Sequence, residues 1–449
     1  MGADLVLLAA VAASVIGALL GCLTGLVPGF HTNNVAAVML ALAPATGAAP
    51  LAAACMVMSC AAAHALSAAI PSIFLAAPEG NAVIGVLPGH RLLLAGRGAE
   101  ALRLHVGGCL GALAVSLVML VPLRWALAPP VDLHGRLLPW LGPALLLGSA
   151  LVVLAEGVRP RPSGTGSRGW RSAAVAALLM LASAALGHLC VFDRRALLAI
   201  GGIGPLFVGL FGLPTLLLAV LDPPTSATGP IGDVAGTDER SARTGPWLGG
   251  PSRWRVVLKG SMVGALVGWF PGTSSGQATM LAVVRSGDAP EGALEGARRY
   301  VLGVAAVGTA NVVFNLAALA TFLRVRSGAT AAVGGLMTWA TAPWTGLLPP
   351  VEVGALLLAI SIGASVAAPV VLMGGRVAAA ARPLLSDRRL LLLVAAALAA
   401  ICVLPGGARA ALVLVAATSL GMLPPLLGVM RVHLMGAMTV PVAVGLLLG

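Results

Sequence analysis

Apolar segments of about twenty residues recur along the whole chain and are separated by short polar connections. An α-helix needs this length to cross the hydrocarbon core of a bilayer, and the roughly ten-residue alternating segments of a membrane β-barrel do not occur. The first set of expected spans covers residues 5–27 and on to 43, 51–78, 104–128, 138–157, 172–192 and 196–220. The second set covers residues 257–283, 300–323, 329–349, 353–374, 390–406, 410–430 and 434–448.

A polar stretch rich in Gly, Pro, Asp and Arg separates the two sets of spans. We therefore expect a first transmembrane repeat at residues 1–220, a polar cytoplasmic linker at 221–256 and a second transmembrane repeat at 257–449. The predicted fold is all-α, a polytopic transmembrane helical bundle of about 12 spans in the cell membrane.

Each expected repeat begins with a helix that a Pro-Gly pair interrupts. The stretch GCLTGLVPGFHTNNVA covers residues 21–36, and GALVGWFPGTSSGQA covers residues 264–278. Both contain two glycines four residues apart and then Pro-Gly, and each matching residue lies 243 positions later in the second stretch. The matching residues are Gly21, Gly25, Pro28 and Gly29 in the first stretch and Gly264, Gly268, Pro271 and Gly272 in the second.

A Pro-Gly pair inside a membrane span frees backbone groups that must find new partners. Proline lacks an N–H, glycine adopts conformations that other residues avoid, and lipid offers no hydrogen bond. The half-helix after the break begins with unpaired N–H groups and a partial positive charge. In this sequence, residue types that cap helix N-termini follow each Pro-Gly pair. These are Thr32, Asn33, Thr273 and Ser274. Two such helix ends would bind an anion without a buried Lys or Arg, and the carbonyls freed before the break could hold Na⁺.

The interrupted helices leave two questions open. A single G-x-x-x-G followed by Pro-Gly is typical of helix packing with a kink, whereas two copies at a fixed offset favour a transport site between two repeats. If each segment crosses the membrane as a broken helix, the repeats are parallel. If each one turns back as a re-entrant hairpin, the repeats are inverted.

Composition and charge agree with a multi-pass membrane protein. Hydrophobic residues make up 59% of the chain, charged residues only 9%, and the mean hydropathy is +1.01. The net charge is +12, but the arginines lie in short loops, as in cytoplasmic loops of membrane proteins, so we expect no nucleic-acid partner. The expected partners are the lipid bilayer and a small-molecule anion. The six cysteines lie inside apolar segments, and neither a metal site nor a bound cofactor is expected.

The interrupted helices and three further segments resemble the TctA family, the large membrane subunit of the tripartite tricarboxylate transporters. They are most similar to its archaeal-type TctA-like branch. The two G-x-x-x-G-x-x-P-G elements resemble those that open each half of the family's members. Residues 71–103, 295–319 (EGARRYVLGVAAVGTANVVFNLAAL) and 431–442 (RVHLMGAMTVPV) resemble other family elements in the same order.

The resemblance implies a carboxylate transporter. Coupling to Na⁺ or H⁺ is expected because the sequence contains no ATP-binding motif. It also implies a small membrane subunit and a binding protein as partners, which we do not assume for this chain. His31 stands where the family usually has Gly, and an acidic residue of the second-half element is missing, so that only Ala310 and Asn311 match cleanly, with Asn315 one turn further on. The missing carboxylate weakens the case for a tricarboxylate substrate.

The candidate substrate-binding residues follow the breaks or match the family pattern. They are Gly29, His31, Thr32, Asn33, Asn34, Gly272, Thr273, Ser274, Ser275, Gln277, Asn311 and Asn315. The helix-break positions are Gly25, Pro28, Gly268 and Pro271.

Three other polar residues lie in or next to expected spans. Glu79 and Asn81 follow an apolar run, and Glu79 fits a functional carboxylate and an interfacial one equally well. His64 lies among Ala and Ser, where a hydrogen-bonded packing histidine is favoured over a proton relay.

The predicted function is an ion-coupled secondary permease for a small organic anion such as a carboxylate, held near the midplane between the two Pro-Gly breaks. Residues 272–276 also read G-x-S-x-G, so an intramembrane serine hydrolase is an alternative, with Ser274 activated by His31 or His64. That alternative leaves the duplicated break unexplained, so no enzyme activity is expected. An exporter of small polar metabolites is a second alternative.

The Arg-rich loops at 91–103, 159–171 and 376–389 should face the cytoplasm, because positive charge is retained on that side during insertion. A cysteine introduced into any of these loops should resist a membrane-impermeant thiol reagent in intact cells and react after lysis. Labelling of one loop from outside would contradict the expected order of spans.

Overall fold

The computed structural model describes most of the expected membrane-embedded chain. The described residues are 3–27, 36, 39–40, 49–74, 89, 92–93, 95–158, 169–192, 203–221, 251–269, 293–337, 343–380 and 387–448. Within these ranges every regular element is a helix, as predicted, and nine helices are long and apolar enough to cross a membrane.

The helices form two compact units. Unit 1 contains α1 (Ala3–Gly25), α3 (Pro50–Ser67), α4 (Ala69–Phe74), α6 (Gly98–Leu127), α12 (Pro251–Trp269), α14 (Ala293–Phe322), α15 (Gly328–Leu336) and α16 (Val351–Ala380). Unit 2 contains α7 (Leu133–Val158), α8 (Gly169–Gly187), α9 (Ile203–Phe207), α10 (Leu213–Leu221), α18 (Arg388–Leu426) and α19 (Gly436–Leu448). It also contains the π-helical turns η1 (His188–Phe192) and η3 (Val208–Gly212) and the 3₁₀ turn η5 (Arg431–Met435).

Each unit draws helices from both of the expected repeats. Compactness and sequence repetition therefore divide the chain in different ways, and the repeat boundaries at 1–220, 221–256 and 257–449 stay a prediction.

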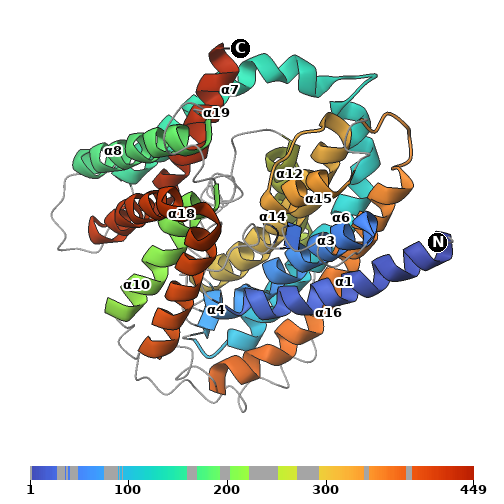
Figure 1. Ribbon diagram of the computed structural model, residues 1–449, viewed down its shortest axis with the longest axis horizontal. Helices are drawn as coiled ribbons and strands as arrows, with labels where there is room; N and C mark the ends of the chain where they lie inside the picture. The colour runs from blue at the N-terminus through green and yellow to red at the C-terminus, as the bar shows by residue number, and fades with distance from the viewer. Residues whose placement is uncertain are drawn as a thin grey trace. The chain divides into compact units, whose positions relative to one another are not determined.

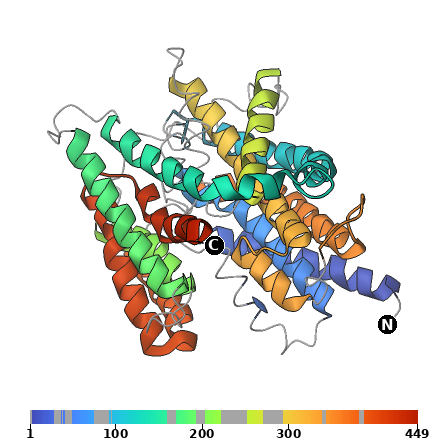
Figure 2. The same ribbon diagram turned by 90° about the horizontal axis from the view of Figure 1, so that it is seen from above.

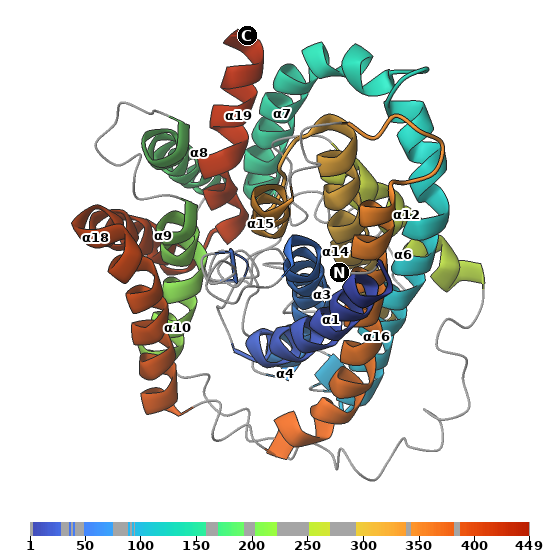
Figure 3. The ribbon, with the colours of Figure 1, turned by 45° about the vertical axis from the view of Figure 1, so that its right-hand side comes forward.

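Two helices, α3 and α14, form the interior of unit 1. The most apolar window of α3 is 89% buried and that of α14 is 78% buried, against 39% for α1. Helices α1 and α16 pack on α3, and helices α12 and α6 pack on α14 (Figures 1 and 3). The polar side chains of α3 and α14 are thus shielded from lipid by the helices around them.

Glycines set the spacing of these helix pairs. A Cβ built on Gly21 of α1 would lie 2.8 Å from the Cβ of Ala63, and one on Gly264 of α12 would lie 2.7 Å from the Cβ of Ala310. No side chain fits at either position, so the backbones of the paired helices approach each other closely, as small-residue motifs allow in membranes.

Unit 2 is built around α18 and α8. Helix α18 packs against α9, η3 and α10, while α8 packs against α19 and η5 (Figure 2). The Asp387 carboxylate caps α18, accepting hydrogen bonds from the N–H groups of Arg389 at 2.6 Å and Leu390 at 3.2 Å. The helix bends at Gly407, whose φ of 61° is easy only for glycine, so the expected spans at 390–406 and 410–430 are its two arms.

The expected span at 329–349 is wrong as a single helix. Helix α15 ends at Leu336 after nine residues, and the described residues 343–350 are not helical. Pro343, Gly346 and the Pro349–Pro350 pair explain the difference, because each of them disfavours a continuous helix.

The replacement of Gly264 with Ala should destabilise unit 1, because the new Cβ would lie 2.5 Å from the carbonyl oxygen of Val307. We expect a loss of about 1–3 kcal/mol, typical of overpacking, seen as earlier thermal unfolding of the purified protein. Gly308→Ala is the matched control, since a Cβ there meets nothing within 4 Å. Equal stability of the two variants would contradict the backbone-level contact.

Candidate functional site

Most of the predicted site lies outside the described residues. This applies to Pro28, Gly29, His31, Thr32, Asn33, Asn34, Glu79, Asn81, Pro271, Gly272, Thr273, Ser274, Ser275 and Gln277. The described part consists of Gly25, His64, Gly268, Asn311 and Asn315, which lie where the two interrupted helices end and on the helices against which they pack.

The end of α1 is joined to α3 through a histidine. Thr24 Oγ1 lies 3.0 Å from His64 Nδ1, and His64 is only 5% exposed. Beside it, a Cβ on Gly25 would lie 2.7 Å from the His64 carbonyl oxygen. The chain then begins to turn, with the N–H of Val27 donating to the carbonyl of Thr24 at 3.2 Å. His64 is therefore a neighbour of the first break.

The end of α12 is joined to a partly buried cation. The Arg326 guanidinium donates from an Nη to the carbonyl of Val267 at 2.6 Å and from Nε to the carbonyl of Gly268 at 3.2 Å. These are among the last carbonyls of α12, a position at which helix carbonyls generally need partners from outside the helix. A cation at a helix C-terminus is also favoured by the helix dipole.

Burial, with a smaller contribution from the charge of Arg324, lowers the pKa of Arg326 to about 10. The guanidinium therefore stays protonated at neutral pH. Its position is fixed by the start of α15, where the N–H of Arg326 donates to Thr330 Oγ1 at 3.1 Å and Ser327 and Thr330 form a capping box. The sequence suggested that carbonyls freed before a break could hold Na⁺. Before the second break, the carbonyls of Val267 and Gly268 accept hydrogen bonds from the Arg326 guanidinium.

Aromatic side chains close the end of α12 against α14. Trp269 is almost fully buried, and its ring centroid lies 5.2 Å from that of Phe322 and 6.3 Å from that of Phe314. This packing holds the last turn of α12 in place just before Pro271.

Asn311 and Asn315 are on α14 at its contact with α12. A Cβ built on Gly264 would lie 3.1 Å from the backbone nitrogen of Asn311. One built on Gly268 would lie 3.1 Å from the backbone nitrogen of Asn315. The Asn311 Oδ1 atom is buried and has no hydrogen-bond partner among the described residues. Because buried polar atoms are nearly always paired, this oxygen is a candidate to accept a hydrogen bond from a ligand or water.

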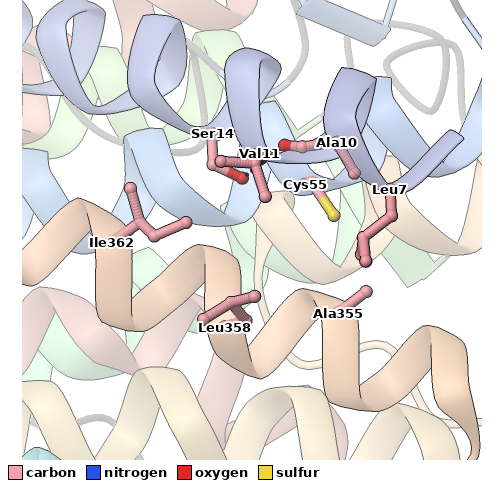
Figure 4. Close-up of a pocket in the computed structure, with 8 residues that line it drawn as sticks. All are labelled: Leu7, Ala10, Val11, Ser14, Cys55, Ala355, Leu358 and Ile362. Atoms are coloured by element: carbon pink, nitrogen blue, oxygen red, sulfur yellow. Dashed lines mark hydrogen bonds between the residues drawn. The ribbon is translucent and has the colours of Figure 1, made fainter. Parts of the chain in front are cut away.

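An apolar hollow lies on the other side of unit 1, between α1, α3 and α16 (Figure 4). The hollow is shallow, and Leu7, Ala10, Val11, Ser14, Cys55, Ala355, Leu358 and Ile362 line it. The only hydroxyl, that of Ser14, donates to the carbonyl of Ala10 at 2.7 Å. A charged substrate would find no partner there, so the hollow is not the substrate site.

Sequence reasoning missed two groups of functional interest. The sequence analysis gave Arg326 no role, although the R-S-x-x-T pattern that forms the capping box was a usable signal. It also passed over Glu156 and His433, which meet in unit 2 at 3.2 Å. Glu156 is the only carboxylate in the apolar run of α7, which was a signal too. Among the described residues no cluster of His, Cys, Asp or Glu could hold a metal ion.

One comparison with known proteins gives a match. The profile of the tripartite tricarboxylate transporter TctA family matches residues 11–436, which is nearly the whole chain. No curated protein and no solved structure matches.

The replacement of Arg326 with Ala should loosen the last turn of α12, because the carbonyls of Val267 and Gly268 would lose their donors. Hydrogen bonds to a charged group contribute about 1.5–3 kcal/mol each. We expect faster amide hydrogen exchange in residues 262–269 and a lower unfolding temperature. Arg324→Ala is the control, since Arg324 is an exposed neighbour. Unchanged exchange in Arg326→Ala would refute the capping role.

Proposed function

The chain belongs to the tripartite tricarboxylate transporter TctA family, and from this premise we propose that it is a secondary permease for a small organic anion such as a carboxylate. The chain is a multi-pass membrane protein and a transporter component, not an enzyme. The family does not favour the serine hydrolase alternative. We further propose coupling to Na⁺ or H⁺ and a substrate held near the midplane between the two Pro-Gly breaks.

The observation that carries the proposal is that two helix pairs of unit 1 pack with the same register. A Cβ on Gly21 would meet the Cβ of Ala63 and the nitrogen of His64, and one on Gly264 would meet the same atoms of Ala310 and Asn311. The next glycine of each helix repeats the relation one turn later. There Gly25 faces Ser67 and Ala68, and Gly268 faces Phe314 and Asn315.

The offset between equivalent residues supports an internal repeat. It is 243 positions for the glycines of α1 and α12 and 247 positions for their partners, for example from Ala63 to Ala310. The two offsets differ by four residues, which is close to one helical turn. The face of α1 that packs on α3 therefore corresponds to the face of α12 that packs on α14. His64 and Asn311 become equivalent, and each break then has a polar side chain of the partner helix beside it.

The third helix of each expected repeat supports the same arrangement. Helix α6 follows α3 in the chain but packs on α14, whereas α16 follows α14 and packs on α3. Both contacts use a glycine. A Cβ built on Gly108 would lie 2.9 Å from the Cβ of Ala305, and one built on Gly363 would lie 2.9 Å from Oγ of Ser59. This exchange is what two intertwined repeats would produce, and it would hold both interrupted helices in one unit.

A total of 12 spans is also part of the proposal. The nine candidate helices in the described residues would be joined by α12, by the continuous helix Ile203–Leu221 and by the first arm of α18. Each of these three is apolar over most of its length and long enough to enter the membrane.

Arg326 supports an anionic substrate. Its charge is partly buried and lies at the end of α12, where a partly desolvated cation attracts an anion more strongly than in water. The N-termini of the half-helices after the breaks would add positive potential from the backbone. Within this site we propose contacts from Thr32, Asn33, Thr273, Ser274, Ser275 and Asn311.

The family works with TctB and TctC subunits in tripartite systems. A co-purification experiment with this chain should therefore look for a small membrane subunit and a binding protein.

The proposal is tested by uptake of labelled citrate, succinate and lactate into proteoliposomes that contain the purified protein. Ser274→Ala and Asn33→Ala should weaken uptake by about ten- to a hundredfold, the loss expected for one hydrogen bond to a charged ligand, while folding is kept. Gly308→Ala serves as a folded control away from the breaks. Unchanged uptake in both site variants would reduce the breaks to kinks. Covalent labelling of Ser274 by a fluorophosphonate would favour the hydrolase.

A further inference from the structure

A buried arginine and a buried tryptophan meet at the end of the α6–α14 pair in unit 1. The Arg124 guanidinium, near the end of α6, donates from an Nη to the carbonyl of Trp344 at 3.1 Å. Its central carbon also lies 5.6 Å from the centroid of the Trp344 ring, which is a cation–π geometry. Arg124 is only 4% exposed and Trp344 only 3% exposed. The two side chains therefore form one cluster that is closed to its surroundings.

The backbone holds this Arg124–Trp344 cluster at one end of two parallel helices. The N–H of Trp344 donates to the carbonyl of Ala320 at 2.7 Å, which attaches residues 343–350 to the end of α14. At the start of the same two helices, Arg298 of α14 donates from Nε to the Glu100 carboxylate of α6 at 2.7 Å. Helices α6 and α14 thus run in the same direction, and the cluster lies at the ends opposite the ion pair.

The cluster also lies near the membrane surface opposite the start of α6. Positions 100 and 124 are 24 residues apart on this helix, or about 36 Å at 1.5 Å per residue. The hydrocarbon core of a bilayer is only about 30 Å thick, so the two positions lie near its two faces. Residues 345–348, which directly follow Trp344, are all exposed. A small solute therefore has only a short path from the surface to the cluster.

Both side chains of the cluster have a buried hydrogen-bond donor without an acceptor. Neither Nε of Arg124 nor Nε1 of Trp344 has a partner among the described residues. The guanidinium and indole N–H groups can only donate, so each of them needs an acceptor. Thr321, the residue after Ala320, has a buried hydroxyl that likewise lacks a described partner. Because buried polar atoms are nearly always paired, this concentration of unused groups points to a ligand.

The guanidinium of the cluster also lacks a counter-charge. Its described contacts are the carbonyl and the ring of Trp344, and no described carboxylate forms an ion pair with it. Asp132, the next carboxylate along the chain, has an exposed side chain beyond the end of α6. A buried cation without an anionic partner is costly, particularly inside a membrane domain. A ligand of this cluster should therefore carry negative charge.

A purely structural role explains Arg124 less well. Arg326 of the same unit uses both Nε and an Nη for backbone carbonyls, whereas Arg124 makes one such bond and leaves Nε buried without an acceptor. The backbone bond to Ala320 already holds Trp344 in place. A water molecule could accept from the two donors, but it would leave the positive charge uncompensated.

We propose that Arg124 and Trp344 form a carboxylate-binding site, in which the Nε–H of Arg124 and the Nε1–H of Trp344 each donate to one carboxylate oxygen. A carboxylate has two acceptor oxygens and one negative charge, so it satisfies two separate donors and neutralises the guanidinium. The site contains no residue of the Pro-Gly elements. It binds an anion whether or not the chain transports one, so it does not rest on the proposed function.

The proposal is tested by NMR of the full-length protein, labelled with a nitrogen isotope in the indole rings of its eight tryptophans and titrated with acetate. The Trp344 signal is identified by its loss in Trp344→Phe. Acetate should shift the Trp344 N–H signal saturably, because a carboxylate oxygen becomes its acceptor. In Arg124→Gln, acetate should bind about ten- to a hundredfold more weakly, the loss expected for one hydrogen bond between charged partners. If this variant fails to fold, Arg124→Lys keeps the charge without the Nε–H and should bind acetate with intermediate affinity.

Two other tryptophans provide internal controls. Trp170 has the Arg171 guanidinium 5.7 Å from its ring centroid but is 64% exposed, so its signal should not show saturable binding. Trp269 reports on the end of α12, because its indole nitrogen is also buried without a described partner. A response at Trp269 alone would place the acetate beside the second break and would overturn the proposal.

Three results at Trp344 itself would also overturn the proposal. These are a signal that does not respond to acetate, a response of equal affinity in the Arg124 variants, and an equal response to chloride at the same concentration. Failure of carboxylate uptake into proteoliposomes would refute the proposed transport function but would leave the acetate response of Trp344 unchanged.

Discussion

The close approach of helix backbones at glycines is the constraint on which unit 1 depends. Lipid tails are as apolar as leucine side chains, so helices in a membrane associate through packing and hydrogen bonds and not through burial of apolar surface from water. Gly21, Gly25, Gly264 and Gly268 each leave no room for a side chain, which brings α1 onto α3 and α12 onto α14. The ends of both interrupted helices are thereby held against a neighbouring helix, and polar side chains of that neighbour come within reach of them.

The two helix ends meet the same backbone requirement with different chemistry. Helix α1 ends beside Thr24 and His64, whose side chains lie within hydrogen-bond distance, whereas the last carbonyls of α12 accept hydrogen bonds from Arg326. A repeated backbone therefore does not imply a repeated set of side chains. If the breaks share one ligand, the second contributes a guanidinium and the first contributes a hydroxyl and an imidazole. Such an asymmetry would orient an anion that has one charged end.

The sequence predicted the all-helical membrane class because this class depends on local patterns, whereas the paired breaks lie outside the described residues and stay a prediction. Apolar length and the spacing of Gly and Pro are visible in one dimension. The sequence did not show that α6 packs on α14 and α16 on α3, since helix partners depend on the shape of faces that all look apolar. It also failed at 329–349, where hydropathy is high but α15 ends at Leu336 and the proline-containing residues 343–350 are not helical. Arg326 was missed because only the fold shows which helix end a distant arginine reaches.

The few ionisable groups inside this chain are each expensive to bury. Anion recognition would come mainly from helix ends and from one arginine that already has backbone carbonyls as partners, so little charge needs to be desolvated when a substrate binds. The same carbonyls stabilise the arginine when no substrate is bound, because hydrogen bonds to a charged group offset part of the cost of its desolvation.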